Sequence, residues 1–180
     1  MKKSMLKHSA KALAGGLTVC LSSISFSAET WDMPLAYSAS NYHSVLAKEF
    51  AEEISSKQDE IKLVTHPSGS LFKGSEIYVS VRRGLAPIGE RLISALSNES
   101  PVYSIDAIPF LASTYEDSWS LYQASKPALE KTLEKHGLKL LYSVPWPPQG
   151  LYANKPINTI TDMKGLKFRA YNPATSHIAE

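Results

Sequence analysis

The chain alternates between short apolar runs and segments in which apolar residues recur every three or four positions. The run 33–38 predicts a strand, and Leu46, Phe50 and Ile54 then recur every four residues, which predicts a helix over 41–54. Further apolar runs predict strands over 61–66, 86–89, 138–144, 151–153 and 166–171. Such alternation of strands and helices is typical of an α/β protein with a parallel sheet.

Capping and turn residues predict the remaining helices. These helices cover 74–83, 114–123 and 125–137. Thr114 and Asp117 have the spacing of a capping box. Asn172 suits an N-cap with Pro173 at the first helical position, which predicts a final helix. That helix reaches Glu180 without a capping glycine, so we expect the chain to be a fragment whose second lobe is incomplete.

The first 28 residues have the composition of an export signal. They contain four lysines and no acid, followed by an uncharged apolar stretch and small residues up to Ala28. The apolar stretch is shorter than the roughly 20 residues that span a bilayer. We therefore expect cleavage after Ser27 or Ala28 and a periplasmic protein. An amphipathic N-terminal helix is one alternative, and a lipoprotein modified at Cys20 is disfavoured by the branched Val19 before it.

Composition and charge narrow the functional class. The 180 residues are 43% hydrophobic and 20% charged, as in ordinary globular proteins that bury a core. The net charge is +2, but without the leader 15 basic residues face 17 acidic ones. This balance argues against nucleic-acid binding. Cys20 is the single cysteine, so the mature chain has neither a disulfide nor a thiolate zinc cluster.

No catalytic motif stands out in the sequence. His43, His66, His136 and His177 lack the i, i+4 spacing of a helical metal site, and we expect them to be surface or helix-cap residues. The sequence also lacks G-x-S-x-G, H-E-x-x-H and a complete phosphate loop. We therefore expect a protein without a cofactor that is not an enzyme; an exported hydrolase is kept as the alternative from a different class.

Arg169 is the residue whose position is most informative. It lies near the end of the predicted strand 166–171, just before the capped helix that starts at Asn172. Ligands of open α/β sheets bind beyond the carboxyl ends of the strands. A guanidinium and a helix N-terminus together suit a carboxylate. The alternative, equally compatible with the pattern, is that Lys167 and Arg169 form the outward face of an edge strand.

Two further groups are candidates for the same site. Glu90 and Arg91 directly follow the predicted strand 86–89, where they would face a cleft or simply begin a solvated helix. Three aromatic residues could form a wall of the cleft, although aromatic residues in strands more often belong to the core. These residues are Tyr37, Trp146 and Tyr152.

Four stretches occur in an order that resembles a known family. They are His66-Pro67-Ser68-Gly69-Ser70-Leu71, the run 86–90, Ile108-Pro109-Phe110-Leu111 (which we expect to be a buried link), and Asp162-Met163-Lys164-Gly165-Leu166-Lys167-Phe168-Arg169. From about Trp31 to Glu180 the chain resembles the N-terminal half of a TRAP transporter substrate-binding protein. The last of the four stretches is the most specific.

The resemblance implies two α/β lobes that close over an organic acid and deliver it to a membrane permease driven by an ion gradient, usually sodium. In the family, the arginine that matches Arg169 binds the ligand carboxylate. Asn172 and Glu90 match residues that often line the pocket, and Tyr37 matches the pocket-facing end of the first strand. Many relatives have a second arginine where this chain has Tyr152, which favours a monocarboxylate over a dicarboxylate.

The prediction is therefore a periplasmic-binding-protein-like α/β fold with a nearly complete first lobe and a truncated second lobe. Residues 1–28 are the signal peptide, 29–144 the first lobe, and 145–180 the crossover and the start of the second lobe. The predicted ligand-binding residues are Tyr37, Glu90, Arg91, Trp146, Gln149, Tyr152, Arg169 and Asn172. Alternatives are the receptor of an ATP-driven importer, and a sensor or scaffold with the same fold.

Overall fold

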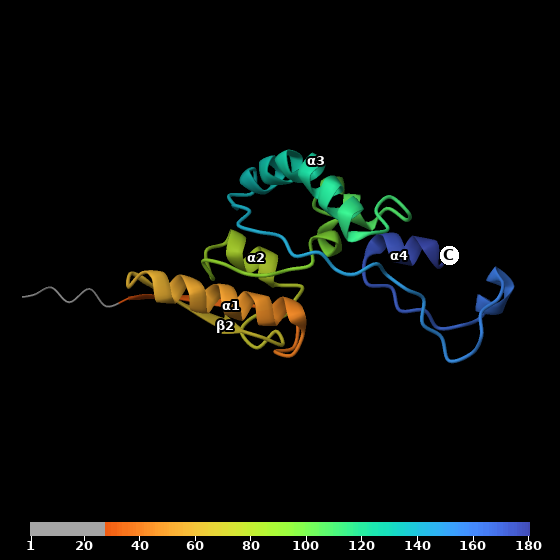
Figure 1. Cartoon of the computed structure of the whole chain (residues 1–180), viewed down its shortest axis with the longest axis horizontal. Coiled ribbons are helices and arrows are strands. Elements are labelled where there is room, and N and C mark those ends of the chain that lie inside the picture. Colours follow the sequence, from red (N-terminus) through yellow and green to blue (C-terminus); the bar gives the residue numbers. More distant parts are fainter. Residues whose placement is uncertain (1–27) are drawn as a thin grey trace, which may run out of the picture.

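The computed structural model describes residues 28–180, so the predicted export signal lies outside the described residues except for Ala28. Helices and 3-10 helices (η) outnumber strands. In chain order the elements are β1 (Glu29–Pro34), α1 (Tyr42–Lys57), β2 (Ile61–His66), α2 (Ile77–Arg82), η1 (Ile93–Leu96), η2 (Pro101–Ala107), α3 (Tyr115–Glu134), η3 (Ile160–Met163) and α4 (Pro173–Ile178). Figure 1 shows α1 and β2 at one end of an elongated molecule and the blue C-terminal part at the other.

The strands β1 and β2 form a parallel pair, which confirms the predicted α/β class. Glu29 pairs with Ile61 at one end of the ladder, and Pro34 pairs with His66 at the other. Helix α1 is the crossover between the two strands and packs against β2. The prediction for β2 is confirmed, whereas β1 lies four residues earlier than the predicted 33–38, because the ladder with β2, and not the apolar run, decides its limits.

The segment predicted as a third strand, 86–89, is followed by a single parallel bridge, in which Glu90 pairs with Leu35 directly after β1. The backbone N–H of Glu90 donates to the carbonyl of Pro34 at 3.1 Å. The prediction of a strand is wrong, but the segment lies beside β1 as expected. Gly89 allows this approach beneath α2, since a Cβ there would lie 2.8 Å from Cγ2 of Ile77.

The segments 138–144, 151–153 and 166–171 are not strands, so these three predictions are wrong. Within residues 28–180 the sheet has two strands. An apolar segment becomes a strand only where a neighbouring strand accepts and donates its backbone hydrogen bonds. The apolar pattern of these segments favours a strand, but within residues 28–180 no neighbouring strand pairs with them.

Two apolar cores hold the molecule together. The first joins the sheet, α1 and the 86–89 segment, and comprises Met33, Leu35, Ala47, Ala51, Leu63 and Ile88. The second joins α2, η1, η2 and α3, and comprises Tyr78, Leu96, Tyr103, Leu129 and Leu133. On α1 the buried residues are His43, Ser44, Ala47 and Ala51, whereas Leu46 of the predicted stripe is 40% exposed. Small residues at the contact let α1 lie close to the strands.

The helical prediction for 114–137 is half right. Thr114 and Asp117 form the predicted capping box, but a single helix, α3, then continues through Pro127 to Glu134. Proline kinks a helix without necessarily ending it, and the buried Leu129 and Leu133 keep the second half packed. The prediction that 108–111 is buried is wrong. Phe110 has a left-handed backbone (φ 64°) that turns the chain, and its side chain is 97% exposed.

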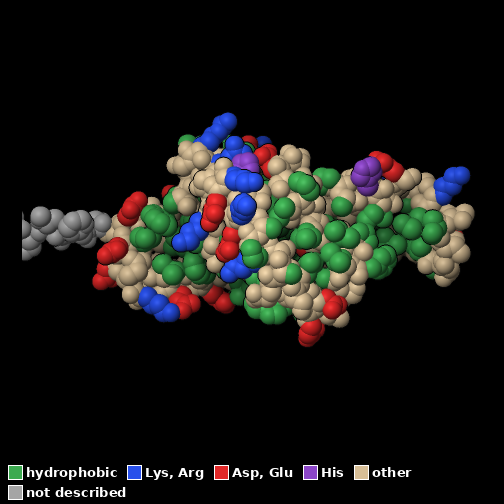
Figure 2. Space-filling model, turned by 90° about the horizontal axis from the view of Figure 1, so that it is seen from above, with side chains coloured by type: hydrophobic (Ala, Val, Ile, Leu, Met, Phe, Trp, Pro, Cys, Tyr) green, Lys and Arg blue, Asp and Glu red, His purple; other side chains and the backbone are tan. Residues whose placement is uncertain are grey.

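Residues from 145 onward form no core of their own. Asn172 is the one buried residue among them, and the part of the chain around η3 extends away from the sheet (Figure 1). Its large apolar side chains stay exposed, and Figure 2 shows hydrophobic patches over this half of the visible face. The most exposed of these residues are Leu151, Tyr152, Ile160 and Ile178. Both apolar cores therefore lie within 29–144, the range predicted as the first lobe.

Candidate binding site

The candidate site lies at the carboxyl ends of β1 and β2, where open α/β sheets bind ligands. Tyr37 follows β1, and its carbonyl accepts hydrogen bonds from the N–H of Ser68, at 2.6 Å, and from the hydroxyl of Ser44, at 3.1 Å. Ser68 follows β2 and Ser44 lies in the first turn of α1. The backbone of Tyr37 is therefore fixed from both neighbouring elements.

Four rings pack together at this edge, and we call Tyr37, Tyr42, His43 and Trp146 the aromatic cluster. The Trp146 ring lies 5.1 Å from Tyr37 in an edge-to-face arrangement, 4.2 Å from His43 and 5.4 Å from Tyr42, measured between centroids. The Tyr42 hydroxyl donates to the carbonyl of Pro145 at 2.7 Å. This bond holds the chain beside α1 just before Trp146. The predicted pair Tyr37 and Trp146 is thus brought together.

Glu90 lies next to the aromatic cluster with its side chain only 16% exposed. Its Oε1 is 3.9 Å from Nδ1 of His43. Burial raises the pKa of Glu90, while the charge of Arg91 and the backbone N–H of Ala36 act in the opposite direction. A carboxylate held in this way is short of water and well suited to accept a hydrogen bond from a ligand.

Two guanidinium groups influence the same place. Burial and the negative charge of Glu90 raise the pKa of Tyr37, whereas the positive charges of Arg91 and Arg169 oppose the rise. Both arginines therefore lie within electrostatic reach of the Tyr37 hydroxyl. Arg91 packs beneath Gly74, since a Cβ on Gly74 would lie 3.5 Å from Nη1 of Arg91.

Three polar atoms of this region are buried and find no hydrogen-bond partner among residues 28–180. They are Nε2 of His43, Oε2 of Glu90 and Nε of Arg91. Buried polar side-chain atoms are nearly always hydrogen-bonded in native proteins, so a group of exceptions at one place needs an explanation. A site for a polar ligand provides one, because its donors and acceptors are only partly satisfied within the protein.

Asn172 is buried as the predicted N-cap of α4. Its Oδ1 accepts from the N–H of Thr175 at 2.9 Å, and its Nδ2 donates to the hydroxyl of Ser94 at 3.2 Å. The side chain therefore fixes the start of α4 against η1. Its predicted contact with a ligand stays a prediction.

The remaining predicted residues are exposed. Arg169 lies on the surface of the segment before α4, Gln149 is exposed, and Tyr152 is 89% exposed with its ring beside Gly150. The structure thus brings Tyr37, Glu90, Arg91 and Trp146 together. Arg169 is close enough for its positive charge to oppose the rise in the pKa of Tyr37. Gln149 and Tyr152 lie apart from the aromatic cluster.

Sequence reasoning missed two members of the aromatic cluster. His43 was expected at the surface or in a cap, but it is 4% exposed, and that prediction is wrong. Tyr42 and His43 directly follow Asn41, whose side chain caps α1 by accepting from the N–H of His43 at 3.0 Å. A helix that begins at the carboxyl end of a strand places its first turn at the ligand edge, and this was the available signal.

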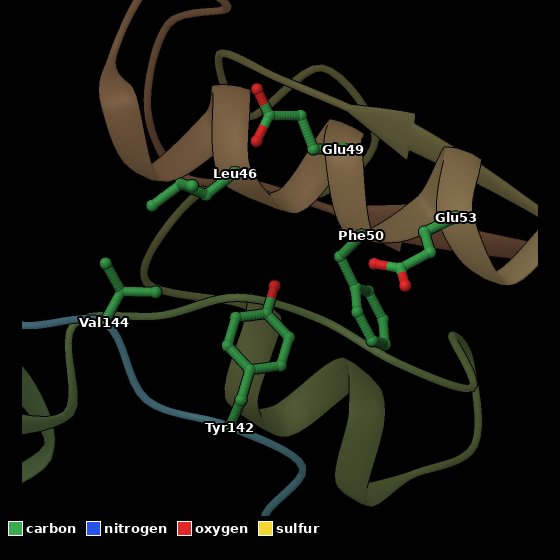
Figure 3. A pocket seen from close by; sticks show the side chains of 6 residues that line it. All are labelled: Leu46, Glu49, Phe50, Glu53, Tyr142 and Val144. Carbon is green, nitrogen blue, oxygen red and sulfur yellow. The ribbon is translucent and has the colours of Figure 1, made fainter.

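A groove with different chemistry runs along α1, between Leu46 and Glu53, beside Tyr142 and Val144. It has a volume of about 260 Å³, and Figure 3 shows the side chains that line it: Leu46, Glu49, Phe50, Glu53, Tyr142 and Val144. Two carboxylates at its rim would repel an organic acid. The aromatic cluster, with two arginines in reach, is therefore the better site for an anion.

Within residues 28–180, no three His, Cys, Asp or Glu side chains gather as a metal site would require. In the same part of the chain, no helix combines the length and the apolar character needed to cross a bilayer. The groups at the site are aromatic faces, a buried carboxylate and guanidinium charges. Guanidinium groups attract a carboxylate, a buried carboxylate accepts a hydrogen bond, and aromatic faces pack against flat groups.

Comparison with known proteins gives consistent matches. The family model described as "Bacterial extracellular solute-binding protein, family 7" matches residues 35–179. A TRAP solute-binding protein specific for pyroglutamate, from an unidentified marine microbe, is 44% identical with a TM-score of 0.83. DctP6 and DctP7 of Bordetella pertussis, both extracytoplasmic solute receptors binding pyroglutamic acid, are 48% and 40% identical, each with a TM-score of 0.81.

The matches extend over most of this chain but not over the relatives. They cover 86%, 83% and 84% of the chain and 51%, 50% and 51% of the three solved proteins, respectively. The chain therefore spans about half the length of these relatives. The likeness supports the predicted two-lobed fold, with the first lobe represented here and the second only begun.

Proposed function

This chain belongs to family 7 of the bacterial extracellular solute-binding proteins, and from that membership we propose that the full-length protein is the pyroglutamate receptor of a TRAP-type transporter. It captures the ligand in a cleft between two lobes and delivers it to a membrane permease. The observation that carries this proposal is the likeness, at 40–48% identity, to three solved receptors of pyroglutamate.

The chemistry of pyroglutamate fits the groups at the candidate site. The molecule is a flat five-membered lactam with one carboxylate, one N–H and one C=O. Arg169 pairs with the carboxylate, since a guanidinium offers two parallel hydrogen bonds to it. Trp146 and Tyr37 supply aromatic faces for the ring. Glu90 accepts the lactam N–H and repels any ligand with a second carboxylate.

The remaining predicted residues have supporting parts in this proposal. Arg91 keeps the Glu90 carboxylate charged from the first lobe. Asn172, three positions after Arg169, fixes the start of α4. Tyr152 and Gln149 belong to the connecting segment that lines the cleft when the lobes close. Closure follows binding because only the closed form contacts the ligand from both lobes.

Binding to the purified full-length protein tests the proposal. After bound ligand has been removed by unfolding and refolding, calorimetry with L-pyroglutamate should give a dissociation constant of about 1 μM or tighter. Glutamate, which carries a second carboxylate and an ammonium group, should bind at least about a hundredfold more weakly. Absence of binding to pyroglutamate at millimolar concentration would overturn the assignment of the ligand.

Export and transport are further parts of the proposal. The leader 1–28 directs the protein to the periplasm, and detection of the mature N-terminus near residue 28 or 29 in a periplasmic extract tests this. Proteoliposomes containing the partner permease should take up pyroglutamate under a sodium gradient without ATP. Uptake that requires ATP would instead favour the receptor of an ATP-driven importer. Turnover of a bound ester or amide would favour the hydrolase.

A further inference from the structure

His43 lies at the centre of the aromatic cluster, in the first turn of α1. It is 4% exposed, and its ring centroid is 4.2 Å from those of both Tyr42 and Trp146. The N-cap of α1 fixes its backbone, because its N–H donates to Oδ1 of Asn41 at 3.0 Å. The imidazole is thus a rigid part of the aromatic cluster. One aromatic neighbour, Tyr42, lies on α1, and the other, Trp146, lies in the segment that follows residue 144.

The two nitrogens of His43 have different surroundings. Nδ1 lies 3.9 Å from Oε1 of Glu90, and Nε2 is buried without a partner among the described residues. Burial lowers the pKa of His43, so the imidazole is neutral at neutral pH. A neutral imidazole carries one N–H, and a proton on Nδ1 directs it at the carboxylate. At 3.9 Å this contact is an electrostatic attraction and not a hydrogen bond.

This arrangement divides the two oxygens of Glu90 between two tasks. Oε1 is directed at His43, and Oε2 is buried with no partner among residues 28–180. We propose that His43 is a positioning residue, which holds the Glu90 carboxylate and the Trp146 indole so that Oε2 accepts a neutral N–H from the ligand. The inference rests on the proposed function and adds a reason for ligand choice: with Glu90 held in this way, the site prefers a lactam to an isostere that lacks the N–H.

The charged and titratable groups around Glu90 come from every element packed against it. Tyr37 follows β1, and Tyr42 and His43 belong to α1. Arg91 is the next residue after Glu90, and Tyr142 lies in the segment that precedes Trp146. Arg169 acts, like Glu90, on the pKa of Tyr37. Apart from Glu90, His43 is the member of this set that gains a charge as the pH falls below neutrality. Protonated His43 would pair with Oε1 and draw the carboxylate away from the ligand.

Two substitutions separate the polar role of His43 from its packing. His43→Phe keeps an aromatic ring against Trp146 and removes the N–H. His43→Asn removes the ring but keeps an N–H donor close to the position of Nδ1. His66→Asn is the matched control, because His66 also pairs with a carboxylate, Asp32, at 2.7 Å, and neither of these residues belongs to the aromatic cluster.

The measurement is the affinity of the full-length protein for two ligands at pH 7.5. One is pyroglutamate, and the other is its carbocyclic isostere, oxocyclopentanecarboxylate, in which a methylene replaces the N–H. The unmodified protein should prefer pyroglutamate by about a hundredfold or more, because the isostere leaves Oε2 unpaired. In His43→Phe the preference should fall below about tenfold, with the affinity for the isostere unchanged within about threefold.

His43→Asn should keep a preference above about thirtyfold, and His66→Asn should keep all of it. A hundredfold preference in His43→Phe would overturn the role of His43 and leave the proposed function intact. If the unmodified protein binds neither ligand, the proposed function itself fails. If His43→Phe does not fold, the pH dependence of ligand affinity in His43→Asn tests the proposal instead. On acidification from pH 7.5, the affinity of the unmodified protein should fall in two proton steps, and that of His43→Asn in one; two steps in the variant would overturn the proposal.

Discussion

Asn172 donates a hydrogen bond from its side-chain amide to the hydroxyl of Ser94, 3.2 Å away, although the two residues are 78 positions apart in the chain. The same side chain caps α4 by accepting from the N–H of Thr175. One asparagine therefore joins the last helix of the chain to η1, next to the segment that carries Arg169. Removing this connection should have a measurable local effect.

Asn172→Ala should loosen α4, whereas Asn172→Ser should loosen it less. Alanine removes both the cap and the bond to Ser94, while serine keeps a capping oxygen but is too short to reach Ser94. We expect losses of about 2 kcal/mol and about 1 kcal/mol, respectively, in the local opening free energy. Hydrogen exchange of the α4 amides in the full-length protein measures this. Equal exchange in both variants would mean that the capping bond to Thr175 adds no stability.

Arg169→Ala should weaken the binding of pyroglutamate by about two to four decades, the effect of breaking a buried ion pair worth about 3–5 kcal/mol. Arg169→Lys should recover little, because an ammonium cannot form two parallel bonds to a carboxylate. Lys167→Ala is the matched control on the same segment and should change affinity by less than about threefold. If calorimetry gives similar small losses for Lys167 and Arg169, both residues simply form an outer face, and the assignment of Arg169 is lost.

Glu90→Gln should stabilise the protein while weakening binding. Burial raises the pKa of Glu90 in the folded state above its ordinary 4.5, so the folded protein binds this proton more tightly than the unfolded chain does. The resulting stabilisation is present in full below pH 4.5 and is lost as pH rises through the raised value. At pH 7.5 the melting temperature of Glu90→Gln should therefore be higher by about 2 °C or more.

The stability gain in Glu90→Gln should disappear below pH 4.5, where the glutamate of the unmodified protein is itself protonated. Affinity for pyroglutamate should fall at least about tenfold at pH 7.5, because a neutral amide oxygen accepts a weaker hydrogen bond than a carboxylate. Thermal melts and calorimetry on the same samples measure both effects. A lower melting temperature at pH 7.5 would show that Glu90 stabilises the fold.

Gly89→Ala should destabilise the first lobe by about 1–3 kcal/mol, the usual effect of overpacking. The new methyl group would lie 2.8 Å from Cγ2 of Ile77 and 3.0 Å from Cγ2 of Val81. Ile77→Leu conserves volume but moves the branch away from Cβ, so the double variant should lose less than the sum of the single losses. Urea denaturation of the four proteins measures the coupling, and strict additivity would exclude a clash with Ile77.

The sequence was informative wherever local rules decide the outcome. The caps at Thr114 and Asn172 are confirmed, because a capping bond joins residues only three positions apart. The prediction of β2 is also confirmed. The segments 138–144 and 166–171 show the opposite case. A strand needs a partner that no local pattern can specify, and the described residues give these segments none.

The candidate site was predictable to a similar degree. Tyr37, Glu90 and Trp146 were identified by their places in the chain, and the structure brings them together. His43 was missed, because a histidine within a helix looks the same in a sequence whether it faces solvent or an aromatic cluster. Its burial depends on Trp146, more than 100 positions later, and only the fold reveals that pairing.

The hydroxyl of Tyr42 donates to the carbonyl of Pro145 and so holds Trp146 beside α1. Since this bond holds the indole against α1, the aromatic cluster forms when the protein folds and is already ordered before a ligand binds. The entropy of ordering these rings is then lost before the encounter, not during it. In the proposed receptor, a lactam would therefore meet aromatic side chains that are already ordered.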